Sequence, residues 1–130
     1  MSDKSPRTHD SHEMEFRSRV VQLILIGSPE KALELLSEHY EVNTPDIRVG
    51  TVKRHRKVLA CYVEREKRIY VSKSEYLNSP AVILHEFYHH LRSSQTGRDR
   101  QVEKRADLFA SGYVEDFKRT YLAGGSRGFR

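Results

Sequence analysis

The feature that most constrains the fold of this chain is a histidine–glutamate string on an apolar helix. Residues 85–89 read H-E-F-Y-H, and apolar residues before and after them cover most of the helix circumference, so the helix is expected to be buried. Ser79 and Pro80 provide a favourable N-cap and a favourable first helical residue. Buried histidine and glutamate side chains are costly unless they are paired or bound to a metal. The string therefore predicts a functional polar centre rather than polar residues on an ordinary helix.

The spacing of the string is typical of a zinc site. His85 and His89 are four residues apart, so they share one face of the helix. Two imidazoles at this spacing can bind a single Zn²⁺, and Glu86 is then placed to act on a water at the metal. The pattern predicts one Zn²⁺ per chain and metal-assisted hydrolysis, with Glu86 as the general base and acid and with peptide bonds as the expected substrate.

A zinc site of this kind needs a third protein ligand and leaves a fourth position open. No histidine follows His90, and the one cysteine, Cys61, lies upstream, so the third ligand is expected to be a carboxylate. The downstream carboxylates are those of Asp99, Glu103, Asp107, Glu115 and Asp116. Residues 93–97 are expected to form a loop, with Asp99 as the N-cap of a second helix. In an antiparallel helix pair, Glu103 would then face His89.

Glu103 is favoured as the ligand, and Asp107 as the carboxylate that accepts a hydrogen bond from a ligand histidine. A shorter loop would bring Asp107 level with the site in place of Glu103. The alternative is that both carboxylates lie on a solvated face and pair with Arg100, Lys104 or Arg105.

The whole pattern, H-E-F-Y-H at 85–89, thirteen intervening residues and E-K-R-A-D at 103–107, resembles the gluzincin metallopeptidases. The short connection and the small size are similar to the minimal gluzincins (minigluzincins), which are themselves similar to the catalytic cores of integral-membrane gluzincin peptidases. The resemblance extends over roughly residues 69–114.

The resemblance implies a role for each matched residue. It implies that His85, His89 and Glu103 bind zinc, that Glu86 is the general base and acid, and that Asp107 supports a ligand histidine. It also implies a zincin-like fold and a protein that can exist in a self-inhibited form. No residue matches the family's oxyanion-stabilising group.

Three further residues are considered for stabilising negative charge on the substrate carbonyl oxygen: Tyr88, His90 and Tyr113. The two tyrosines are more simply interpreted as core aromatics whose hydroxyl groups have partners. His90 is one step around the helix from His89 and is therefore expected to face elsewhere.

The remaining elements predict an α+β domain. Three short strands are expected at residues 48–52, 58–63 and 68–72, and their spacing suggests a meander, with other strand orders left open. One of these strands would form an edge of the cleft, to which an extended peptide could add. Helices are expected at residues 13–26 and from Pro29 to about residue 40. The predicted fold is a zincin-like α+β domain with a small, mainly antiparallel sheet and about four helices.

The length of 130 residues predicts one domain. Residues 12–123 are expected to form this domain, and residues 1–11 and 124–130 flexible tails. No stretch is apolar enough for a membrane span or a signal peptide, and a single cysteine is typical of a reducing cytoplasm. A monomer is expected, or a self-inhibited form in which the C-terminal tail or a second copy in a dimer covers the cleft.

The formal net charge of +5 admits a second class of function. A basic turn containing Lys53, Arg54, Arg56 and Lys57 could contact nucleic-acid phosphates. Few aromatic residues lie among these charges, which gives base stacking little support, and a solvated turn is the simpler interpretation. A protease that acts near nucleic acid and a zinc-binding module without catalysis are the two alternative functions.

Overall fold

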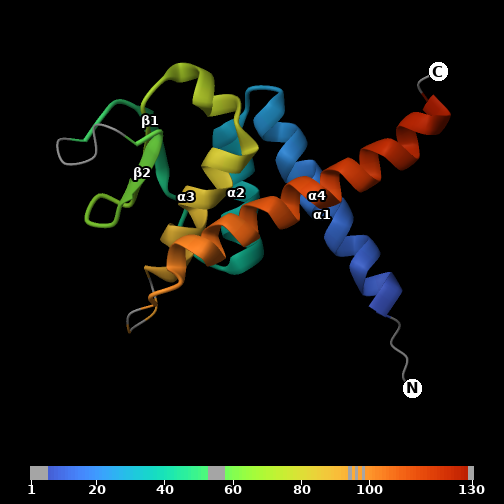
Figure 1. Cartoon of the computed structure of the whole chain (residues 1–130), viewed down its shortest axis with the longest axis horizontal. Helices are drawn as coiled ribbons and strands as arrows, with labels where there is room; N and C mark the ends of the chain where they lie inside the picture. The colour runs from blue at the N-terminus through green and yellow to red at the C-terminus, as the bar shows by residue number, and fades with distance from the viewer. Residues whose placement is uncertain (1–5, 53–57, 94, 96, 98, 129–130) are drawn as a thin grey trace.

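The computed structural model describes residues 6–52, 58–93, 95, 97 and 99–128, with side chains described from residue 11 to residue 122. The elements in chain order are α1 (Pro6–Leu25), α2 (Pro29–Tyr40), β1 (Asp46–Val49), β2 (Ala60–Val63), β3 (Arg68–Val71), the 3₁₀ helix η2 (Ser74–Asn78), α3 (Pro80–Arg92) and α4 (Val102–Gly128). Figure 1 shows the sheet at one side of α3, and α1 and α4 crossing on the other side. The expected α+β class with four α-helices is confirmed in the described residues.

The sheet differs from the expected meander. Its strand order is β1-β3-β2, with Ile47 of β1 opposite Ile69 of β3 in a parallel pair and Tyr62 of β2 opposite the same Ile69 in an antiparallel pair. The sheet is therefore mixed, and one of its two pairings is antiparallel. β3 takes the central position because Ile69 and Val71 are fully buried, whereas β1 and β2 are edge strands with partly or largely exposed residues.

The helix that carries the H-E-F-Y-H string begins as its sequence predicts. Ser79 is the N-cap, and its hydroxyl accepts a hydrogen bond from the backbone N–H of Val82 at 3.4 Å. Pro80 is the first helical residue, where a missing N–H costs nothing. The core-facing residues of α3 are Ile83, Leu84 and Phe87. They belong to one core cluster with residues of α1, α2, β3 and α4: Val20, Ile24, Leu33, Leu36, Ile69, Val71 and Tyr113.

Helical backbone extends into both of the segments predicted to be tails, since α1 begins at Pro6 and α4 ends at Gly128. The far ends of these two helices diverge from the sheet in Figure 1. Among the described residues, no helix combines the length and the apolar character that a membrane crossing requires.

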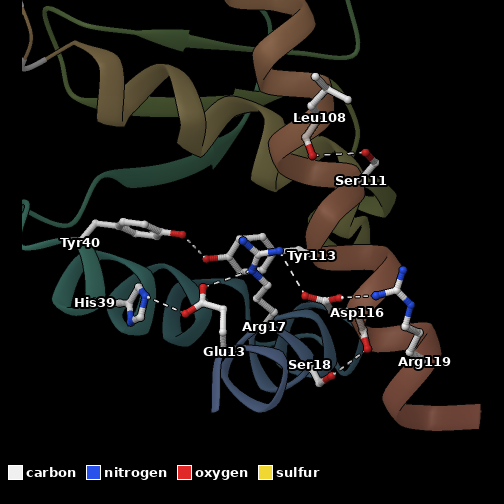
Figure 2. Close-up of polar contacts among 10 residues, drawn as sticks. All are labelled: Glu13, Arg17, Ser18, His39, Tyr40, Leu108, Ser111, Tyr113, Asp116 and Arg119. Atoms are coloured by element: carbon white, nitrogen blue, oxygen red, sulfur yellow. Dashed lines mark hydrogen bonds and ion pairs between the residues drawn. The ribbon is translucent and has the colours of Figure 1, made fainter. Parts of the chain in front are cut away.

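A charged cluster joins α1 to α4 where the two helices cross (Figure 2). Arg17 of α1 donates to Asp116 of α4 at 3.2 Å and to Glu13 at 3.2 Å. The Arg17 guanidinium also lies 4.9 Å from the centroid of the Tyr113 ring. Asp116 is buried, and its second oxygen accepts from Arg119 at 3.3 Å. The pairing thus stabilises a buried carboxylate and a cation over an aromatic face.

Replacing each of the two arginines with alanine should separate the buried contact from the exposed one. Arg17→Ala removes the cation from a half-buried cluster and should lower the free energy of unfolding by roughly 2 kcal/mol. Arg119→Ala removes a side chain that is 67% exposed and should cost less than about 0.5 kcal/mol. Urea unfolding monitored by circular dichroism measures both changes. Equal losses would contradict the view that Arg17 is the partner on which Asp116 depends.

Candidate metal centre

The α3 helix places the three polar residues of the string on the wall of a cleft. Its other side carries Ile83, Leu84 and Phe87, which are fully buried and fix the rotation of the helix. His85 and His89 consequently lie one turn apart on the open side, with their ring centroids 5.2 Å apart. The helical periodicity therefore places both imidazoles at the surface of the cleft, as predicted.

The first turn of α4 brings a carboxylate to both histidines. His85 Nε2 lies 2.9 Å from one oxygen of Glu103, and His89 Nε2 lies 3.2 Å from the other. One donor atom from each of the three residues can be chosen so that all lie within 4.8 Å of one another. The antiparallel helix pair thus brings the Glu103 carboxylate beside both histidines.

Asp107 occupies the other side of the His85 ring, where its Oδ1 lies 2.8 Å from Nδ1. Carboxylate oxygens therefore face both ring nitrogens of His85. A neutral imidazole has one N–H, and with that N–H donated to Asp107 the Nε2 lone pair points at Glu103. Two lone pairs at 2.9 Å repel each other unless a positive charge lies between them, so the site calls for a proton or a metal ion at Nε2.

The spacing of the donor atoms suits a metal. In a tetrahedral zinc site with bonds of about 2.0–2.1 Å, neighbouring ligand atoms lie about 3.3 Å apart. The 2.9 and 3.2 Å contacts found here, one to each oxygen of Glu103, are close to that value, and a set of one donor atom per residue lies within 4.8 Å. The carboxylate on Nδ1 is the usual partner of a metal-bound histidine, because it holds the tautomer and the ring orientation. Two imidazole nitrogens and one carboxylate oxygen form a donor set that fits Zn²⁺.

One of the alternative partners considered for these carboxylates, Arg105, pairs with a different residue. Arg105 Nε pairs with Asp99 at 3.1 Å, and Asp99 also accepts a hydrogen bond from the Gln101 N–H at 2.9 Å. Asp99 therefore organises the turn that precedes α4, close to its predicted role as N-cap. Glu103 and Asp107, in contrast, are directed at histidines.

Glu86 is the most buried polar residue that lines the cleft, with 8% of its surface exposed. Burial raises the pKa of Glu86 to about 7, the charge of His85 opposes this rise, and the carboxylate of Glu103 adds to it. Burial also lowers the pKa of His89 below its ordinary value, against the opposing effect of Glu103. A neutral His89 ring is the form that can offer a lone pair to a metal.

His85, Glu86, His89, Glu103 and Asp107 all line one cleft, which has a volume of about 840 Å³. Its lining is formed by Val58, Leu59, Ala60, Cys61, Tyr62, Glu64, Ala81, Val82, His85, Glu86, His89, Arg92, Ser93, Glu103 and Asp107. Edge strand β2 and the residues before it form the wall opposite α3. The sequence analysis did not assign Arg92 to the cleft, although its position seven residues after His85 places it on the same helical face.

The three residues considered for the oxyanion are directed away from the cleft. His90 is buried and is held at Nδ1 by the Tyr62 hydroxyl at 2.7 Å and at Nε2 by the Asn43 carbonyl oxygen at 2.6 Å. Tyr113 is fully buried, and its hydroxyl shares a 2.6 Å hydrogen bond with that of Tyr40.

Tyr88 packs against the ring of Phe109. The interpretation as a core aromatic with a hydrogen-bonded hydroxyl is confirmed for Tyr113, whereas Tyr88 is only partly buried. None of the three residues lines the cleft. The basic turn of Lys53, Arg54, Arg56 and Lys57 lies outside the described residues, so its contact with nucleic acid stays a prediction.

Comparisons of the chain with protein-family models, with curated proteins and with solved structures gave no significant match. The chemistry of the site is therefore inferred from its donor set, its buried carboxyl group and its cleft.

Removing each donor should distinguish ligands from their supporting residue. His85→Ala, His89→Ala and Glu103→Ala should each abolish stoichiometric zinc binding, because two remaining donors hold the ion weakly. Asp107→Ala should keep the zinc with affinity lowered about 10- to 100-fold, as is typical of a lost hydrogen-bond partner of a ligand. Competition with a chromophoric chelator measures the affinity. Glu115→Ala, on an exposed part of α4, is the matched control, and weakened binding in that variant would contradict the assignment.

The metal-free protein should be stabilised at alkaline pH by Glu86→Gln. The folded-state pKa of about 7 exceeds the ordinary value of 4.5, so protonation of Glu86 stabilises the fold fully below about pH 4.5. That contribution is lost as the pH rises through 7. The variant should match the wild type near pH 4 and exceed it at pH 8 by up to roughly 3 kcal/mol.

Thermal unfolding in the presence of a chelator at the two pH values measures the difference for Glu86→Gln. Glu64→Gln, which alters an exposed carboxylate lining the same cleft, serves as the control. A Glu86→Gln variant with the same stability difference at both pH values would show that Glu86 titrates normally.

Proposed function

We propose that the protein is a zinc-dependent metallopeptidase of the gluzincin type, which hydrolyses peptide bonds and acts in the cytoplasm. The observation that carries the proposal is the convergence of His85 Nε2 and His89 Nε2 on the carboxylate of Glu103, beside the buried Glu86 in the same cleft. A site that bound zinc for structural reasons alone would favour a closed set of four protein ligands. Three donors in an open cleft favour catalysis.

His85, His89 and Glu103 would hold the zinc ion, and Asp107 would keep the Nε2 of His85 directed at it. When bound, zinc supplies Lewis acidity, which lowers the pKa of a water and polarises the scissile carbonyl group. The chain's own contribution is to hold three donors with one carboxylate partner and to leave the remaining side open to substrate.

Glu86 would transfer the proton. A pKa of about 7 suits a group that must accept a proton from water and then donate it to the leaving amine near neutral pH. The apolar packing of α3 holds the Glu86 carboxyl group at the cleft, where its low exposure limits competition from bulk water.

Edge strand β2 supports a peptide as the substrate. Its one partner in the sheet of described residues is β3, so its other edge can accept main-chain hydrogen bonds from an extended chain. The strand lines the same cleft as the proposed ligands. A peptide added there would pass the zinc site and be recognised largely through its backbone.

The experiment that tests the proposal compares wild type with Glu86→Ala. Both proteins should contain about one zinc per chain, by elemental analysis, because Glu86 is not a ligand. Cleavage of casein or of a fluorogenic peptide should occur in the wild type and fall by at least about 100-fold in the variant, as is usual when a general base is removed.

Two other outcomes would separate the alternatives. Zinc in both proteins without cleavage in either would favour a latent enzyme or a zinc-binding module, and removal of residues 124–130 would then test whether the C-terminal segment inhibits cleavage. If the wild-type protein is prepared in the presence of zinc and still contains no bound metal, the proposal is overturned.

A further inference from the structure

The cleft changes in character along α3. Its α3 wall begins with the apolar residues Ala81 and Val82, continues through the proposed zinc site, and ends with Arg92 and Ser93. Ala81 and Ser93 are separated by about 18 Å along the helix axis at 1.5 Å per residue. About five residues of an extended peptide at 3.3 Å each fit this length. A bound peptide would therefore reach both the apolar end and the charged end at once.

Arg92 introduces a positive charge into a lining that is otherwise acidic. Among the described residues that line the cleft, it is the one lysine or arginine, and the acidic members are Glu64, Glu86, Glu103 and Asp107. The side chain of Arg92 is 27% exposed, so its charge is screened less than that of a fully solvated arginine.

The neighbours of Arg92 neutralise it incompletely. Its Nη1 donates to the uncharged side-chain oxygen of Gln95. Its Nη2 lies 3.9 Å from Asp99 Oδ2, which is too long for a hydrogen bond. That same oxygen lies closer to Arg105, at 3.1 Å. A guanidinium carries five N–H donors in a planar fork suited to a carboxylate, and among the described contacts most of these donors are left to a ligand.

The place of Arg92 relative to the zinc site defines which part of a substrate it would reach. Arg92 follows His89 by three residues, so it lies about 4.5 Å further along the helix axis. Since an extended peptide advances about 3.3 Å per residue, the group within reach belongs to a residue one or two positions from the scissile bond. Tyr62, held by His90 at 2.7 Å, places strand β2 beside this end of α3.

We propose that Arg92 is a specificity-determining residue that binds a substrate carboxylate one or two residues from the scissile bond. This inference rests on the proposed function and names the substrate class: peptides with a negative charge beside the cleaved bond. The carboxylate can belong to an aspartate or glutamate side chain or to a free C-terminus, and both share the same chemistry.

The test measures cleavage and binding separately. Zinc-loaded wild type is assayed with quenched fluorogenic peptides that differ only by glutamate or glutamine at each of the two positions on either side of the bond. Matched short peptides with a free or an amidated C-terminus distinguish the two sources of the carboxylate. Binding of the same peptides is measured by fluorescence anisotropy on zinc-loaded Glu86→Ala, in which hydrolysis does not interfere.

In the wild type, the preferred glutamate peptide or free-acid peptide should have a kcat/KM about tenfold higher than its neutral partner, as expected for a hydrogen-bonded ion pair. Arg92→Gln should reduce this ratio to near one. Arg92→Lys retains the charge and should keep part of the preference. Arg100→Gln removes an exposed cation that does not line the cleft and should leave the ratio unchanged. Circular dichroism and zinc content verify that each variant is folded.

The outcomes distinguish this inference from the proposed function. Cleavage of all peptides without a preference for a carboxylate, or a preference that survives in Arg92→Gln, would overturn the role of Arg92 and leave the peptidase intact. Absence of cleavage, with anisotropy showing Arg92-dependent binding of the charged peptides in the Glu86→Ala background, would support the role of Arg92 and count against catalysis. Equal binding of charged and neutral peptides in that background would overturn the inference by itself.

Discussion

The His85 ring lies between two carboxylates of α4, with Asp107 at 2.8 Å from Nδ1 and Glu103 at 2.9 Å from Nε2. Because a neutral imidazole can donate to one of them only, the arrangement is stable when a positive charge lies at Nε2. A proton can provide that charge, but His89 directs a second nitrogen at the same Glu103 carboxylate, and burial lowers the pKa of His89 and so disfavours its protonation. A divalent cation satisfies all three donors together, which a single proton cannot do.

This electrostatic demand explains how such exposed carboxylates can be held in place. The side chains of Glu103 and Asp107 are 71% and 75% exposed, and exposed ion pairs contribute little when they stand alone. The rigid part of the site is α3, whose opposite side packs into the core through Ile83, Leu84 and Phe87. The first turn of α4 is not itself fixed by these contacts. The middle of that helix is fixed to α1, because Arg17 of α1 contacts Asp116 and Tyr113 of α4. A bound metal would therefore stabilise the start of α4 more than it would alter α3, and the stability of the folded state would then rise with the logarithm of the metal concentration.

The sequence is most informative where the signals are local. The N-cap at Ser79, the first-turn Pro80 and the four-residue histidine spacing each depend on neighbouring residues alone, and α3 agrees with them. The site also needed one non-local assumption, that a short connection makes α3 and α4 antiparallel. That assumption sufficed although the connection, residues 93–101, is longer than a tight helical hairpin loop. The placement of Glu103 and Asp107 follows from it.

The sheet and the charged end of the cleft were harder to predict for opposite reasons. Three strands of similar length and composition carry no local signal for strand order, and the parallel pairing of β1 with β3 places at the centre the strand whose Ile69 and Val71 are fully buried. Arg92, by contrast, has a clear helical register with His85, but an arginine near a helix C-terminus is expected there for its favourable interaction with the helix dipole. Only the cleft opposite β2 shows that this cation faces the same space as the proposed ligands. A residue that would act on substrate through its charge alone belongs to no spaced sequence motif. It can be identified only when the residues that line the cleft are known.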